Sequence, residues 1–160
     1  MNTQFKAARV ENYRVSDRSA ADIRYLVIHF TANDGDTAKN NADYFAREAP
    51  GVSAHFFVDE KEIWQSVREK DIAWHCGTRG MYFHPYCRNA NSLGIELCSR
   101  KQGEKYYFTP ETVKNAQNFV RFLMKKYDIP LANVVRHYDV THKNCPAPFV
   151  EDAAAWQSFK

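Results

Sequence analysis

The chain has 160 residues, of which 44% are hydrophobic and 26% are charged, and its formal net charge is +3. The length suits one domain, and the composition is typical of a globular protein and excludes a disordered or fibrous one. The small net charge excludes the dense basic surface of a nucleic-acid-binding protein, and every apolar stretch is far shorter than the ~20 residues that a membrane span requires.

The first half of the chain alternates strand and helix patterns. A β-branched and aromatic run that includes His29 indicates a central strand. Apolar residues at helical spacing, between a capping Asp36 or Thr37 and the helix-ending Pro50, indicate a helix. Two apolar runs around a short polar break then indicate a β-hairpin. In chain order we expect an N-terminal arm or irregular segment over residues 1–20, a strand over 25–30, a helix over 38–46 and a hairpin of 53–58 with 62–65.

The second half begins with a long loop, of a length that is often functional in compact domains. Further along, Thr109 can cap a helix whose first residue is Pro110, and an apolar stripe continues to Tyr127. In chain order we expect a loop over residues 76–91, a strand over 92–97, a helix over 110–127, a short strand from 134 into Arg136 and a terminal helix over 150–159.

Strands interleaved with helices predict an α/β fold with a central mixed β-sheet flanked by helices. No repeat, low-complexity segment or linker divides the chain, so we expect a single domain over residues 1–160.

The cysteines and the N-terminus bear on where the protein is made. The four cysteines form no CxxC pair, and the N-terminus has scattered charges without the apolar core of a secretory signal. We therefore expect synthesis in the cytoplasm without a signal peptide, and reduced thiols in preference to a disulfide framework.

Two histidines and a cysteine form a candidate metal site. His29 lies on the strand over 25–30, and His137 and Cys145 bracket a segment of the form His-x7-Cys. Three protein ligands leave a fourth position for water, whose pKa on zinc falls towards ~7, whereas four ligands indicate a structural site. The ligand count favours a catalytic zinc. The spacing is not a diagnostic motif by itself, and a lone histidine is more often an ordinary surface or core residue.

Glu96 is a candidate for acid–base chemistry. It lies within an apolar strand, where a buried carboxylate is costly unless it is paired or functional. Side-chain alternation lets Leu93, Ile95 and Leu97 face the core while Glu96 faces the other way. Glu96 is therefore either an outward-facing strand residue or part of the floor of a cleft.

Five ordered motifs resemble those of a known enzyme family, the zinc-dependent N-acetylmuramoyl-L-alanine amidases. This family includes short phage lysozyme-amidases, bacterial anhydro-muropeptide amidases and animal peptidoglycan recognition proteins. The resemblance runs from about Arg24 to Pro148, and the ordered set is much more specific than any one motif. The motifs are LVIHFT at residues 26–31, VSAHFF at 52–57, AWHCG at 73–77, NSLGIEL at 91–97, and RHYD at 136–139 with KNCP at 143–146.

The resemblance implies a role for each candidate residue. His29, His137 and Cys145 match the ligands of one zinc ion per chain. Lys143 matches the residue that stabilises the oxyanion, and Glu96 matches the catalytic carboxylate of the muropeptide-amidase branch. The positions implied to contact the substrate are His55, His75 and Trp74.

One position departs from part of the family. Ala54 stands where the phage lysozyme branch and many recognition proteins have a tyrosine. This difference disfavours a tyrosine-assisted mechanism and makes Glu96 the better candidate for the proton transfer.

The resemblance implies hydrolysis of the amide between N-acetylmuramic acid and L-alanine in bacterial peptidoglycan, in a zinc cleft at the edge of the sheet. The favoured role is that of a phage or prophage endolysin catalytic domain, a monomer that acts on the cell wall after release by a holin-type system. No nucleic acid partner and no membrane insertion are expected.

Three alternatives stay open at the level of the sequence. The first is a cytoplasmic muropeptide-recycling amidase. The second is a peptidoglycan-binding module without activity, against which the presence of both histidines and Cys145 argues. The third is a cysteine hydrolase that uses Cys145 with His137 and no metal.

Overall fold

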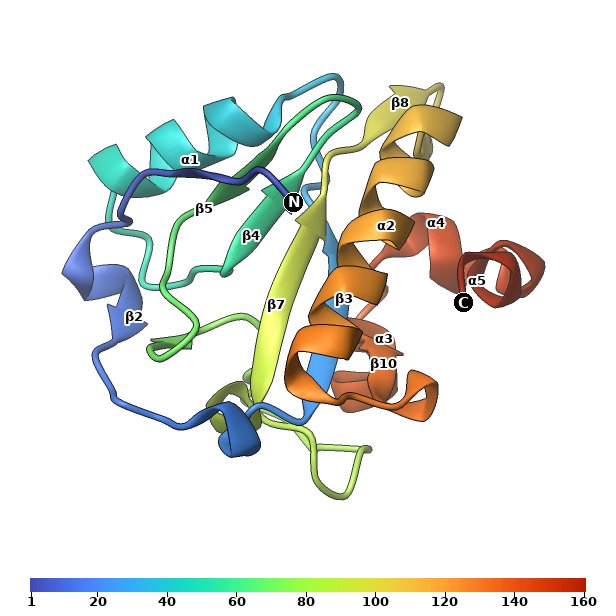
Figure 1. The fold of residues 1–160 in the computed structure, drawn as a ribbon. Helices are drawn as coiled ribbons and strands as arrows, with labels where there is room; N and C mark the ends of the chain where they lie inside the picture. Colours follow the sequence, from blue (N-terminus) through green and yellow to red (C-terminus); the bar gives the residue numbers. More distant parts are fainter.

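A mixed six-stranded sheet forms the centre of the computed structural model, which describes all residues 1–160 (Figure 1). The strand order is β1-β5-β4-β7-β3-β10. Strands β4, β7, β3 and β10 are parallel to one another, and β5 runs antiparallel to β4. This architecture confirms the expected single α/β domain with a central mixed sheet. The strands are β1 Gln4–Phe5, β3 Tyr25–Phe30, β4 Phe56–Val58, β5 Ile63–Gln65, β7 Ser92–Leu97 and β10 Val134–Arg136.

The two central strands β3 and β7 have the bounds that their sequences predict. Both are apolar runs with β-branched residues, which suit a strand buried within a parallel sheet. They pair in parallel along their whole length, with Tyr25 beside Ser92 and His29 beside Glu96. The expected hairpin is also present as β4 and β5, although its strands are shorter than predicted.

Two long helices begin at the caps that the sequence offers. Helix α1 spans Ala38–Arg47, and the Thr37 side chain accepts a hydrogen bond from the backbone N–H of Asn40. Helix α2 spans Pro110–Tyr127 and is capped by Thr109. None of the helices is long and apolar enough to cross a membrane. The remaining helices are α3 His137–Thr141, α4 Ala147–Val150, α5 Ala153–Phe159 and the 3-10 turns η1 Val10–Asn12, η2 Ala20–Asp22, η3 Asn89–Asn91 and η4 Leu131–Asn133.

The structure corrects the prediction of one terminal helix over residues 150–159. The chain instead forms α4 and α5, because Asp152 leaves the helical conformation between them. Its side chain accepts a hydrogen bond from the backbone N–H of Ala155 and so caps the second helix.

Two small antiparallel pairs and helix α3 were not predicted from the sequence. Strand β2 (Tyr13–Arg14) pairs with β6 (Ile72–Ala73), and β8 (Arg100–Gln102) pairs with β9 (Lys105–Tyr107). The turn of the second pair includes Gly103, whose φ of 60° favours glycine.

The two faces of the sheet differ in chemistry. Helix α2 covers one face, where it packs against the inward residues of β3, β4 and β7 in the main apolar core (Figure 1). On the opposite face, α1 packs near Phe57 of β4. On the part of this second face that β3 and β7 form, Tyr25 and Val27 belong to a small apolar cluster, whereas His29 and Glu96 lie side by side near the carboxyl ends of the two strands.

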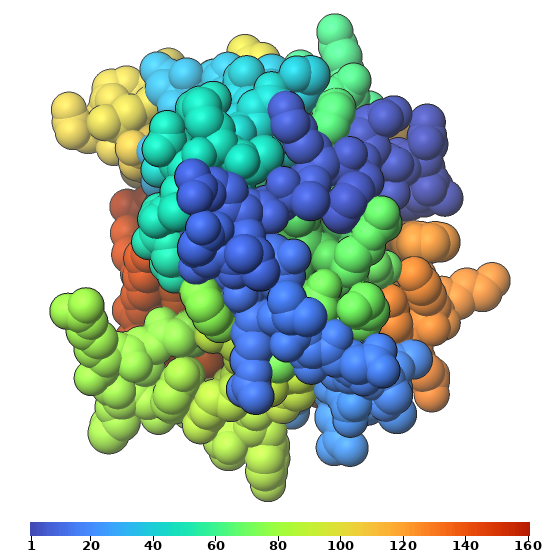
Figure 2. Space-filling view, turned by 90° about the vertical axis from the view of Figure 1, so that its left-hand side faces the viewer, coloured from blue at the N-terminus to red at the C-terminus, as the bar shows by residue number.

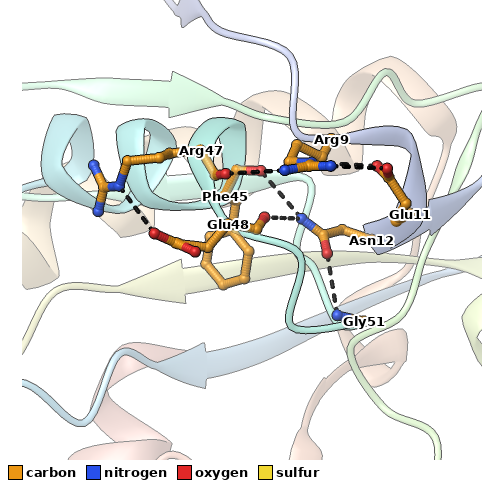
Figure 3. Close-up of polar contacts among 7 residues, drawn as sticks. All are labelled: Arg9, Glu11, Asn12, Phe45, Arg47, Glu48 and Gly51. Atoms are coloured by element: carbon orange, nitrogen blue, oxygen red, sulfur yellow. Dashed lines mark hydrogen bonds and ion pairs between the residues drawn. The ribbon is translucent and has the colours of Figure 1, made fainter.

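The N-terminal residues 1–20, expected as an arm or irregular segment, run along the β5 edge of the molecule, where β1 is the outermost strand of the sheet and β2 pairs with β6. Figure 2 shows this segment in dark blue, lying across the molecule beside α1. Asn12 attaches it to the end of α1, since its amide donates to the carbonyls of Phe45 and Glu48 and its side-chain oxygen accepts from Gly51 N–H (Figure 3). These bonds satisfy carbonyl groups that a helix end leaves without partners.

Candidate functional site

Strand β7 presents a polar side to the second face of the sheet. Leu93, Ile95 and Leu97 belong to the core under α2, so the alternating residues Ser92, Gly94 and Glu96 face the other way. The register places Glu96 next to His29 of β3. The sequence left Glu96 either as an outward-facing strand residue or as part of the floor of a cleft. The structure supports the second interpretation.

Three ligand-type side chains meet beside this floor. His29 comes from β3, His137 from the first turn of α3 and Cys145 from the segment before α4, and their ligand atoms lie within 4.8 Å of one another. The segment folds back because the backbone N–H of Tyr138 donates to the carbonyl of Cys145. All three ligand residues are buried, with exposed fractions of 2%, 6% and 4%.

The geometry of this cluster fits a metal ion. The Nδ1 atom of His29 lies 3.6 Å from the Sγ atom of Cys145, and about 3.6 Å is the separation expected for a nitrogen and a sulfur ligand on one tetrahedral zinc. Both ring nitrogens of His137 are buried without any hydrogen-bond partner. A buried polar group without a partner is costly, and a bound cation would supply one.

The protonation of the cluster also suits metal binding. Burial lowers the pKa of His29 well below its usual value and the pKa of His137 to about 3, so both rings are neutral with a free lone pair at pH 7. Burial raises the pKa of the Cys145 thiol to about 12, so the thiol keeps its proton until a cation stabilises the thiolate.

A cleft of about 640 Å³ opens over the cluster and over Glu96. The Glu96 side chain is partly exposed to the cleft, while its Oε2 atom is buried without a hydrogen-bond partner. Burial raises the pKa of this carboxyl to about 8, and the charge of Lys143 partly opposes the rise. The Lys143 side chain is exposed and also lines the cleft. The cleft therefore combines a candidate metal site, a proton-carrying group and a free cation.

The structure does not place His55 in this cleft, which corrects its expected role as a substrate contact. Its side chain is 0% exposed. The Nδ1 atom accepts a hydrogen bond from Gly94 N–H at 3.1 Å, and the Nε2 atom lies 3.0 Å from the carbonyl of Asp71, to which it donates. Both ring nitrogens are thus used inside the protein, where they join β4, β7 and the segment before β6.

The two other expected substrate contacts do line the cleft. Trp74 is partly exposed there, and its backbone is joined to Ser53 by two hydrogen bonds. His75 is 9% exposed, with its Nδ1 atom 2.9 Å from His29 Nε2 and its Nε2 atom 3.0 Å from Ser92 Oγ. Sequence reasoning missed Ser92, although its spacing of four residues from Glu96 on one strand gives both residues the same face.

Comparison with known proteins agrees with this geometry. The family model described as N-acetylmuramoyl-L-alanine amidase matches residues 19–148. The chain is 34% identical to the N-acetylmuramoyl-L-alanine amidase CwlL of Bacillus licheniformis, over 95% of this chain and 44% of the relative. It is 35% identical to the N-acetylmuramoyl-L-alanine amidase BlyA of Bacillus subtilis, over 86% of this chain and 40% of the relative.

Solved structures show the same fold. The catalytic domain of XlyA superposes with a TM-score of 0.78 and 31% sequence identity, over 99% of this chain and 97% of that domain. The chain thus spans less than half the length of these two curated relatives, but nearly all of this solved catalytic domain.

Proposed function

Because the chain belongs to the N-acetylmuramoyl-L-alanine amidase family, we propose that it hydrolyses the amide between N-acetylmuramic acid and L-alanine in peptidoglycan. The observation that carries this proposal is the convergence of His29, His137 and Cys145 within 4.8 Å, beside the partly exposed carboxyl of Glu96. Amide hydrolysis needs activation of a water molecule, stabilisation of an oxyanion and protonation of the leaving amine. The cleft contains a group suited to each of these tasks.

The three ligand residues would hold one zinc ion. Three protein ligands would leave a fourth position open, as in catalytic zinc sites. When bound, zinc supplies a Lewis acid that polarises the scissile carbonyl and activates water near neutral pH. The protein would contribute two neutral imidazoles and, once the metal displaces the proton of Cys145, one thiolate, so the ligand set would carry only one negative charge.

Glu96 would move the proton. Its raised pKa of about 8 lies close to neutral pH, where a group can both accept and donate a proton during one reaction. It would accept the proton of the attacking water and deliver it to the leaving nitrogen of L-alanine. Lys143 would stabilise negative charge on the carbonyl oxygen, because its ammonium is free in the same cleft.

The remaining parts of the proposal concern substrate and biological role. Trp74 would contact the substrate with its indole ring, since it lines the cleft and is partly exposed. The amidase names of the relatives support a role in peptidoglycan hydrolysis. We further propose that the chain acts on the cell wall as a monomeric endolysin catalytic domain, after release by a holin-type system.

Two alternatives are less consistent with the site. A cysteine hydrolase needs a reactive thiolate, but burial raises the pKa of Cys145 and so favours the thiol. A binding module without activity would not need the complete His-His-Cys cluster or a buried carboxyl with an unpartnered oxygen.

Removal of the metal is expected to abolish hydrolysis of purified cell walls. Metal analysis should find about one zinc per chain, and a strong chelator should remove both the metal and the activity, because the proposed chemistry depends on the Lewis acid. Stoichiometric zinc should restore the activity. Full hydrolysis by a sample shown to be free of metal would reject the zinc mechanism and favour the cysteine hydrolase.

A further inference from the structure

A chain of hydrogen bonds leads away from the candidate metal site into the backbone. His29 Nε2 lies 2.9 Å from His75 Nδ1, and His75 Nε2 lies 3.0 Å from Ser92 Oγ. The Ser92 hydroxyl in turn donates to the carbonyl oxygen of Arg88 at 2.7 Å. Ser92 is 0% exposed and His75 is 9% exposed, so water competes little for these groups.

The carbonyl at the end of this chain and a singly protonated His75 ring together determine the direction of every hydrogen bond in it. A carbonyl oxygen only accepts, so the Ser92 hydroxyl must donate to Arg88 and accept from His75 Nε2. When the ring carries a single proton, His75 is then protonated at Nε2 and accepts at Nδ1. The proton between the two rings consequently belongs to His29 Nε2. The Nδ1 atom of His29 is left with a lone pair, and this is the atom that lies 3.6 Å from Cys145 Sγ.

Strand β7 is built to hold the His75 ring in this place. A Cβ atom added at Gly94 would lie 2.6 Å from His75 Cγ, a distance that real Cβ atoms do not show. Only glycine leaves room for the ring between Ser92 and Glu96. On this face of β7, Ser92 hydrogen-bonds the His75 ring, Gly94 leaves space for it, and Glu96 is the candidate acid–base group.

We infer that His75 and Ser92 are positioning residues, which fix the tautomer and orientation of His29 so that its Nδ1 atom binds the metal. This inference rests on the proposed zinc site. It replaces the expectation that His75 contacts substrate, because both nitrogens of its ring are already engaged within the protein. A histidine ligand whose other nitrogen donates to a fixed acceptor is better oriented and a stronger base.

The tautomers of the wild-type protein test this inference without any substitution. In the zinc-loaded protein, long-range ¹H–¹⁵N NMR spectra should show His29 bound through Nδ1 and protonated at Nε2, and His75 protonated at Nε2 alone. Binding of zinc through His29 Nε2, or a proton on His75 Nδ1, would overturn the inference.

Zinc affinity in matched variants gives a second readout that does not depend on activity. Ser92→Ala should weaken zinc binding about 10-fold, as measured by competition with a chromophoric chelator. This is the lower end of the loss in metal affinity that follows removal of an outer-sphere partner. Ser66→Ala is the control, because Ser66 is equally buried and its Oγ atom has no hydrogen-bond partner. We expect the control to bind zinc as the wild type does.

Substitutions of His75 separate the hydrogen bond from the volume of the ring. His75→Ala should lose about 10- to 100-fold in zinc affinity. His75→Asn should recover part of this loss, because its amide oxygen can accept from His29 Nε2–H. Equal zinc affinity in wild type, Ser92→Ala and His75→Ala would overturn the inference while leaving the zinc site intact. A wild type that binds no zinc would instead overturn the proposed site, and the inference with it.

Discussion

Cys145→Ala is expected to lose zinc and, as a result, hydrolysis of the cell wall. The substitution removes a direct ligand, whose Sγ atom lies 3.6 Å from His29 Nδ1. Because loss of an outer-sphere partner already costs about 10- to 100-fold in metal affinity, loss of a ligand should cost on the order of 100-fold or more. Metal analysis after dialysis and chelator competition measure this directly.

Cys98→Ala is the matched control for this experiment. Cys98 is also a free, buried cysteine, but it packs against α1 near Phe57 and does not line the cleft. The control should keep zinc and activity. Zinc retention by Cys145→Ala at the wild-type level would show that Cys145 is not a ligand. The metal would then be bound by a different set of residues.

Glu96→Gln should separate proton transfer from metal binding. The amide has nearly the same shape as the carboxyl but cannot accept and return a proton, so turnover should fall about 10²-fold or more. Zinc content and folding should stay at wild-type levels, because Glu96 is not among the clustered ligands. Rates of wall hydrolysis, zinc analysis and circular dichroism together test the three expectations.

The surface residue Glu62 provides a control for the same chemical change. It directly precedes strand β5, and its carboxylate accepts a hydrogen bond from the indole N–H of Trp64. Glu62→Gln should hydrolyse walls at the native rate. If Glu96→Gln does so as well, Glu96 is only a strand residue at the cleft and another group carries the proton.

Elements with a strong local pattern were predictable from the sequence. Strands β3 and β7 and helix α2 have the predicted bounds, because an apolar run or an amphipathic stripe with a capping threonine defines each of them locally. The division between α4 and α5 was not predictable in this way. There the side chain of Asp152 competes with continued helix by capping the following turn.

The candidate site was predictable only in part. The sequence motifs indicate His29, His137, Cys145 and Glu96, but they do not show that β3 and β7 are neighbours in register, which is what brings His29 beside Glu96. His55 shows the opposite error. It lies within a family motif, yet its ring nitrogens are used to join backbone segments in the interior. A motif identifies a position but not the direction in which its side chain points.

The central claim is that this cleft cleaves the amide between the sugar and the stem peptide, and the products of wall digestion test it most directly. Purified peptidoglycan is incubated with the zinc-loaded protein, and the soluble products are analysed by mass spectrometry and end-group labelling. The proposal predicts new free amino termini on L-alanine and no new reducing sugar ends. New reducing ends would indicate a glycosidase, and new amino termini on other stem residues would indicate a peptidase; either result would contradict the proposal.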